Sequence, residues 1–190
     1  MATVEPIRDP KKIDAMKSYL KGEDIRDYAM FTVGVNVALR ISDLLALTWG
    51  DVLDENGKKF KTIKIKEGKT QKKRDIKLNK AAQKALKELL ETLDTYNMYD
   101  FIFKSREGEN KPITRQQALN VLKDAAEAVG VEENVGTHTL RKTWGYYAWR
   151  NGFNPALIME TLNHSNLSMT KRYLGITQDE INNLYDNLNI

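Results

Sequence analysis

Apolar side chains recur every three or four residues along most of this 190-residue chain, which is the spacing of helices that bury one face. One stretch, from about residue 52 to 78, alternates between apolar and polar residues and therefore predicts strands. With no internal repeat and no long linker, we expect one mostly helical α+β domain over residues 1–190. The expected helices cover about residues 9–22, 24–39, 42–47, 79–93, 114–130, 136–151 and 154–162, with a turn from 168 to 173 and a last helix over 177–188.

The alternating stretch contains two turn signals. Asn56-Gly57 is a strong hairpin signal, and residues 68–71 form a second polar turn. Residues 59–66 and 74–78 alternate isoleucine or leucine with charged residues, and residues 52–53 supply a further short apolar pair. The pattern predicts a small antiparallel sheet of three strands with a strongly positive outer face.

Positive charge is concentrated in one part of the chain. The whole sequence carries 30 basic and 26 acidic residues, a net charge of +4. Residues 58–87 hold 13 Lys or Arg and two acids, a net charge of +11, so the remainder is at −7. A focused basic patch suits a polyanionic partner such as nucleic acid, although a solvated lysine face gives the same pattern.

Composition excludes several classes of site. Cysteine is absent and only two histidines occur, so neither disulfides nor thiolate or histidine-rich metal sites are expected. No apolar run reaches the roughly 18 residues needed to span a bilayer, and the first residues lack a signal peptide's basic and apolar blocks. We therefore expect a cytoplasmic protein that needs no metal or cofactor.

One short segment combines groups that suit phosphate chemistry. His138 and Arg141 lie three residues apart near the predicted start of a helix, so they share one face. A helix N-terminus also favours an anion. A proton-transfer group, a fixed cation and backbone donors would then converge on one place, as a reacting phosphate requires. Taken alone, the same pair is more often a surface histidine and an ion-paired arginine.

Five segments together resemble the motifs of the tyrosine recombinases of the phage integrase family, in the family's order. The His-x-x-Arg motif is residues 138–141 (HTLR), and the nucleophile motif is residues 170–174 (TKRYL). The others are residues 38–49 (ALRISDLLALTW), 68–74 (GKTQKKR) and 162–165 (LNHS). The resemblance implies that family's catalytic, DNA breaking-rejoining fold. The implied catalytic residues are Arg40, Lys69, His138, Arg141, His164 and the nucleophile Tyr173.

The resemblance also implies a mechanism. Tyr173, nine residues after His164, would attack a DNA phosphate and form a 3′-phosphotyrosyl link while a 5′-hydroxyl leaves. Arg40, Arg141 and His164 would stabilise the phosphate oxygens, Lys69 would protonate the leaving oxygen, and His138 would assist proton transfer. Asp43 is expected to orient Arg40. Asn163 stands where the family usually has glycine, and since asparagine also tolerates positive φ, we expect little effect. Duplex DNA would be held by Lys64, Lys66, Lys72, Lys73 and Arg74.

The resemblance covers nearly the whole chain, yet most family members carry a further DNA-binding domain ahead of this one. Here about ten residues precede the first predicted helix, so we expect no N-terminal core-binding or arm-binding domain and weak DNA binding. The family implies integration, excision or inversion by a tetramer joined through the helix over 177–188. The alternatives are a catalytically idle DNA-binding regulator and a type IB topoisomerase-like enzyme. An RNA-binding module ranks last, because the predicted strands carry no aromatic pairs that could stack on bases.

Overall fold

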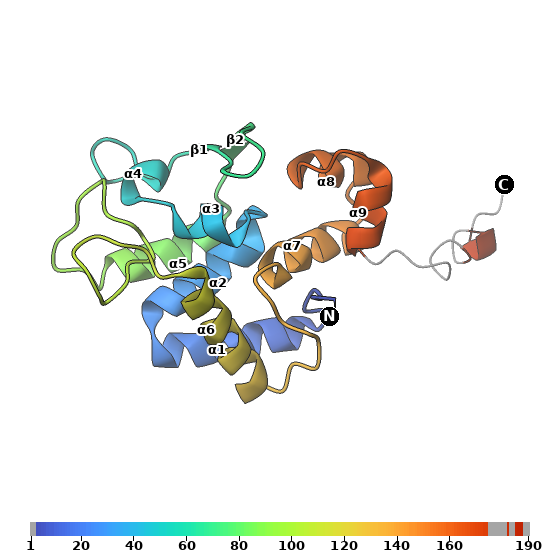
Figure 1. Cartoon of the computed structure of the whole chain (residues 1–190), viewed down its shortest axis with the longest axis horizontal. Helices are drawn as coiled ribbons and strands as arrows, with labels where there is room; N and C mark the ends of the chain where they lie inside the picture. The colour runs from blue at the N-terminus through green and yellow to red at the C-terminus, as the bar shows by residue number, and fades with distance from the viewer. Residues whose placement is uncertain (1–2, 175–181, 183–184, 188–190) are drawn as a thin grey trace. The chain divides into compact units, whose positions relative to one another are not determined.

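The structure, a computed structural model, describes residues 3–174, 182 and 185–187 (Figure 1). The chain divides into two compact units, Met1–Trp144 and Gly145–Ile190, and each is described by itself. The expected last helix over residues 177–188 lies mostly outside the described residues. Among the described helices, none combines the length and apolar character needed to cross a bilayer.

Helices form most of the first unit, and α2 (Ile25–Val37) lies at its centre. Nine of the thirteen α2 residues are buried, so the helix is enclosed on nearly all sides. It packs against α1 (Pro10–Glu23), α3 (Ile41–Leu45), α5 (Lys80–Leu90) and α6 (Arg115–Ala128), as Figure 1 shows for α1, α5 and α6. This packing fixes the end of α2, which leads directly into one of the predicted site motifs.

Local capping signals explain where the helices begin. Asp9 accepts a hydrogen bond from the Lys11 N–H at the start of α1, and Asn79 and Thr114 cap α5 and α6 in the same way. The starts predicted for these three helices, at about residues 9, 79 and 114, are confirmed. The third helix, expected to start at about residue 42, begins at Ile41 instead, because the chain turns into α3 at Arg40.

The predicted sheet is present but smaller than expected. Strands β1 (Ile63–Lys66) and β2 (Lys73–Ile76) pair antiparallel. The predicted third strand is wrong: the chain at 49–52 forms the short helix α4 (Trp49–Val52), which leaves a single bridge between Leu53 and Phe60. The Asn-Gly turn forms as predicted, with the Gly57 N–H donating to the Asp54 carbonyl at 2.9 Å.

The segment before α1 is held by hydrogen bonds to a distant part of the first unit. The Glu5 N–H donates to the Asn134 carbonyl at 3.0 Å, and the Ile7 N–H donates to Thr143 Oγ1 at 2.9 Å. Val4 also packs so closely on Gly136 that a β-carbon there would lie 2.5 Å from a Val4 methyl. The lead-in therefore braces the chain just ahead of His138.

The second unit contains the end of α7 (Thr139–Arg150), then α8 (Pro155–Thr161) and α9 (Leu167–Leu174). Asn154 caps α8 and a proline occupies the favoured first position, so the predicted helix start near residue 154 is confirmed. Gly145 of α7 permits close packing on α9, because a β-carbon there would lie 3.0 Å from a Leu174 methyl.

Candidate active site

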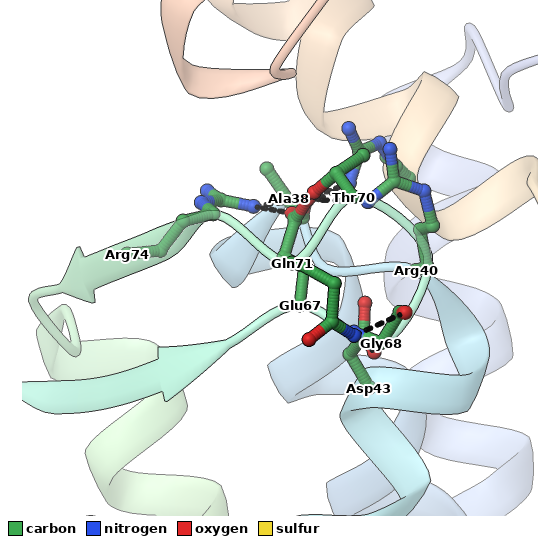
Figure 2. A network of polar contacts seen from close by, with 9 residues as sticks. Ala38, Arg40, Asp43, Glu67, Gly68, Thr70, Gln71 and Arg74 are labelled. Atoms are coloured by element: carbon green, nitrogen blue, oxygen red, sulfur yellow. Dashed lines mark hydrogen bonds and ion pairs between the residues drawn. The ribbon is translucent and has the colours of Figure 1, made fainter.

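Arg40 lies in the bend between α2 and α3. Helix α2 ends because Ala38 adopts a left-handed conformation with φ 53° and ψ 27°, which is uncommon for a residue with a β-carbon. Arg40 follows in extended conformation at the N-cap of α3. The bend turns the Ala38 carbonyl and the Arg40 side chain toward the β1–β2 loop, where Figure 2 shows them beside Glu67.

Glu67, the residue after β1, joins the predicted site residues of the first unit. Its side chain is fully buried at 0% exposure. Oε2 accepts hydrogen bonds from Arg40 Nη1 and, at 2.7 Å, from Thr70 Oγ1. Oε1 accepts one from Arg74 Nη1 at 2.9 Å (Figure 2 shows Glu67, Arg40, Thr70 and Arg74) and lies 3.7 Å from Arg141 Nη1. One buried carboxylate thus pairs with three guanidinium groups.

Arg141 reaches the same place from α7. It lies in the first turn of that helix and is 3% exposed. Its Nη1 donates to the Ala38 carbonyl at 2.9 Å, and Arg74 Nη1 donates to the same oxygen at 3.3 Å. The two predicted phosphate-binding arginines, 101 positions apart in sequence, are therefore connected through Glu67 and the neighbouring Ala38 carbonyl.

His138 lies just before α7, and its carbonyl accepts from the Lys142 N–H at 2.9 Å. Although the residue reaches solvent, partial loss of hydration lowers the pKa of its imidazole below the ordinary 6.5. The positive charges of Arg141, Arg115, Arg40 and Lys142 lower this pKa further. Since Arg40 and Arg141 both act on this ring, all three belong to one positively charged site in the first unit.

Lys69 lies in the loop between β1 and β2, as predicted. The Glu67 N–H donates to the Lys72 carbonyl at 3.0 Å and the Gln71 N–H donates back to the Glu67 carbonyl at 2.8 Å, which closes the loop. Gln71 takes a left-handed φ of 58°. The Lys69 side chain is exposed, so its amine can reach a bound ligand without breaking a buried contact.

Asp43 supports the loop instead of the first arginine. Its Oδ1 accepts from the Gly68 N–H at 3.1 Å (Figure 2 shows both residues), whereas the carboxylate that binds Arg40 comes from Glu67. The sequence suggests that Asp43 orients Arg40, because it is three residues away on the same helix. The structure gives that contact to a residue 27 positions away.

The outer face of the hairpin is basic, as predicted. Lys64, Lys66, Lys72 and Lys73 are all exposed, and Lys66 lies directly opposite Lys73 in the strand register. Like charges in such a pair destabilise a sheet, so this face is better suited to an anionic partner than to free solvent. Arg74, predicted with them as a DNA contact, is half-buried and hydrogen bonded to Glu67 and Ala38.

The second unit brings His164 and Tyr173 together. Their rings meet edge to face with centroids 4.9 Å apart and planes at 73°. His164 Nδ1 lies 3.0 Å from Thr170 Oγ1, and Thr170 is fully buried in α9, which fixes the imidazole beside the tyrosine. Asn163 has φ 53°, so the predicted positive φ before the histidine is confirmed.

Four predicted catalytic residues, Arg40, Lys69, His138 and Arg141, thus belong to the first unit and two belong to the second. Sequence reasoning missed Glu67 and the Ala38 carbonyl. The signal for Glu67 was available: it is one of only two acids among residues 58–87, and it occupies an inward position directly after β1.

Comparison with known proteins assigns the family. The sequence profile of the phage integrase family matches residues 9–188, nearly the whole chain. The chain belongs to the phage integrase family. This tyrosine recombinase is 41% identical over 179 residues to the probable integrase/recombinase YoeC of Bacillus subtilis, a match that covers 94% of this chain and 93% of YoeC. It is 30% identical to tyrosine recombinase XerD of Listeria innocua over 85% of this chain, but spans only 54% of that protein's length.

Solved structures show the same fold for this tyrosine recombinase. The crystal structure of XerA recombinase matches with a TM-score of 0.76 at 21% identity, over 100% of this chain and 68% of XerA. XerH site-specific recombinase bound to a palindromic difH substrate matches with a TM-score of 0.71 at 20% identity. The match covers 97% of this chain and 54% of XerH. The expected family and its catalytic-domain fold are therefore confirmed. The relatives are integrases and recombinases, which favours recombination over topoisomerase or regulatory activity.

Proposed function

We propose that this tyrosine recombinase cleaves and rejoins DNA at specific sites through a 3′-phosphotyrosyl intermediate on Tyr173. The observation that carries the proposal is the convergence of Arg40 and Arg141 on Glu67 and the Ala38 carbonyl, beside His138. Two fixed guanidinium groups next to a titratable imidazole match the needs of a phosphate that gains charge as it reacts.

In the cleavage step, Tyr173 Oη attacks the scissile phosphorus and the bond from phosphorus to the 5′-oxygen breaks. Lys69 gives a proton to that leaving oxygen, and the tyrosine proton passes to a base, a role for the neutral imidazole of His138. Arg40 and Arg141 bind the non-bridging oxygens, each contact being worth on the order of 3 kcal/mol. His164, whose ring contacts Tyr173, adds a further hydrogen bond to the phosphate.

Rejoining is the reverse reaction with a new partner. The 5′-hydroxyl of another strand attacks the phosphotyrosyl link and Lys69 takes up its proton. The bond from phosphorus to Tyr173 Oη breaks, and the tyrosine oxygen regains the proton held by His138. The covalent link conserves the energy of the broken phosphodiester bond, so no nucleotide cofactor is consumed. In our proposal Lys64, Lys66, Lys72 and Lys73 hold duplex DNA by phosphate contacts, while Arg74 acts from inside the protein.

Assembly and location complete the proposal. Exchange between two duplexes needs several protomers, and residues 177–188 are the segment we expect to join them in a tetramer on DNA. The sequence of that segment supports this role, since apolar residues recur in it at helical spacing. We expect the protein to work in the cytoplasm, associated with the nucleoid when bound to DNA.

The test is covalent capture on DNA of unspecified sequence. Duplexes with a randomised core and a nick that lets the released 5′ fragment diffuse away are incubated with the protein, and denaturation-resistant adducts are recovered and sequenced. We expect adducts that converge on a site and contain phosphotyrosine at position 173. Tyr173→Phe should abolish them, and Tyr99→Phe, which changes an exposed tyrosine of the first unit, should not.

Three results would overturn parts of the proposal. Adducts that persist in Tyr173→Phe would assign the nucleophile elsewhere, and no adduct from the wild-type protein would point to an idle DNA-binding regulator. Relaxation of supercoiled plasmid without exchange between duplexes carrying the selected site would point to topoisomerase activity.

A further inference from the structure

The environment of Glu67 is unusual for a carboxylate. Burying an ionised group costs several kcal/mol unless it is paired and its lone pairs are satisfied. Glu67, at 0% exposure, meets that need with hydrogen bonds from Arg40, Arg74 and Thr70. A buried ion pair is weak evidence for a gain in stability, which suggests that Glu67 has a further role.

The partners of Glu67 indicate that role. Arg40 and Arg141 are the residues to which the proposed function assigns the scissile phosphate, and each directs one Nη1 toward this carboxylate. A guanidinium has five N–H donors in a rigid fork, so a carboxylate beside one donor orients the whole group. Arg40 remains 16% exposed, which leaves part of its fork accessible.

The backbone of Glu67 adds a second connection. Its N–H and carbonyl close the loop that carries Lys69, through Lys72 and Gln71. Thr70, in the same loop, donates to the carboxylate that holds Arg40. Glu67 therefore contacts both Arg40 and Arg141 through its side chain and closes the Lys69 loop through its backbone.

We propose that Glu67 is a positioning residue that holds Arg40 and Arg141 in the orientation needed to bind the scissile phosphate. The inference rests on the proposed function and deepens it. Glu67 acts through the arginines, and the DNA need not touch it. Because a misplacement of about 1 Å at a reacting centre can cost about 10²-fold in rate, a loosened pair of arginines should slow cleavage strongly.

The test uses Glu67→Gln in the full chain, on the site recovered by covalent capture. Asp75→Asn is the matched control, since Asp75 is the other acid of residues 58–87, lies exposed on β2 and gives the same change in net charge. We expect Glu67→Gln to form the covalent adduct about 10- to 100-fold more slowly than Asp75→Asn at saturating DNA.

Two modified substrates separate a positioning role from a general loss of structure. A methylphosphonate at the scissile position replaces a charged non-bridging oxygen with a methyl group, so that the arginines matter less. A 5′-bridging phosphorothiolate has a sulfur leaving group that needs no proton, so that Lys69 matters less. We expect the ratio of the cleavage rates of Asp75→Asn and Glu67→Gln to become smaller on the methylphosphonate substrate. On the phosphorothiolate substrate the same ratio should stay unchanged.

Equal cleavage rates for the two variants on unmodified DNA would overturn the proposal. So would a rate difference that persists on the methylphosphonate substrate, or one that disappears on the phosphorothiolate substrate. Faster cleavage by Glu67→Gln would mean that the carboxylate competes with the phosphate, which also overturns it. If thermal melting shows that Glu67→Gln does not fold, Glu67→Asp keeps the charge but shortens the reach and must show the same substrate pattern. A wild-type protein that forms no adduct would refute the proposed function instead.

Discussion

At the scale of single residues, His138 reports most directly on the charge of the site. Its imidazole is partly dehydrated and experiences the positive charge of four side chains, two of them from α7, so protonating it costs more than in the unfolded chain. At neutral pH the ring is therefore neutral and can accept a proton. A histidine with the ordinary pKa would be partly protonated under mildly acidic conditions and less able to act as a base.

This lowered pKa predicts a pH dependence of stability. The unfolded chain takes up a proton at His138 near pH 6.5, whereas the folded protein does so only at lower pH, so acidification through this window favours unfolding. Between about pH 7.5 and 5.5, urea denaturation should show a larger loss of the free energy of unfolding for the wild type than for His138→Gln. His164 is present in both proteins and cancels, and an equal or smaller loss in the wild type would contradict the lowered pKa.

At the scale of helices and strands, local chemistry was predictable and pairing was not. The starts of α1, α5 and α6 could be predicted because a capping residue, here Asp9, Asn79 or Thr114, acts on backbone groups two or three residues away. The third strand failed because the residues before it form α4, whose start is held by Thr48 and Asp51 in a capping box that competes with strand pairing. Helix ends and turns therefore follow from the sequence more closely than the extent of a sheet.

Two helix glycines give a paired test of close packing. A β-carbon added at Gly22 in α1 would have no atom within 4 Å, so Gly22→Ala should raise the free energy of unfolding by about 0.5–1 kcal/mol. Gly34→Ala in α2 gains the same helix propensity, but its methyl would lie 2.5 Å from Leu140 Cδ1 and 3.1 Å from Leu44 Cδ2. Overpacking costs typically about 1–3 kcal/mol, so Gly34→Ala should be less stable than Gly22→Ala by about that amount in urea denaturation. Equal stabilisation by both substitutions would contradict this prediction.

At the scale of the whole molecule, the order of the motifs could be read from the sequence, and the residue that connects them could not. Arg40, Lys69, His138 and Arg141 each stand in a recognisable segment. Glu67 contacts side chains 27 and 74 positions away, and nothing local to it indicates those contacts. The available signal was an acid at an inward position within a run of lysines, but a count of net charge does not single such a residue out.

The concentration of charge predicts how DNA binding depends on salt. Replacing Lys64, Lys66, Lys72 and Lys73 together with alanine should weaken binding to a short duplex of random sequence. It should also make the slope of log K against log salt shallower by about 0.9 for each phosphate that the protein no longer neutralises. The matched control replaces four exposed lysines elsewhere, Lys11, Lys80, Lys111 and Lys123, and changes net charge equally. Equal effects on the slope would show that overall charge, and not the hairpin face, attracts DNA.

The extended lead-in to α1 has a practical consequence for anyone who labels or fuses this protein. Its backbone hydrogen bonds to Asn134 and Thr143 enclose the stretch in which Gly136 and His138 lie. A tag, fluorophore or surface tether attached ahead of residue 3 would therefore act first on these hydrogen bonds, which hold the chain just ahead of His138. A tag placed there should therefore be checked for its effect on the surroundings of His138.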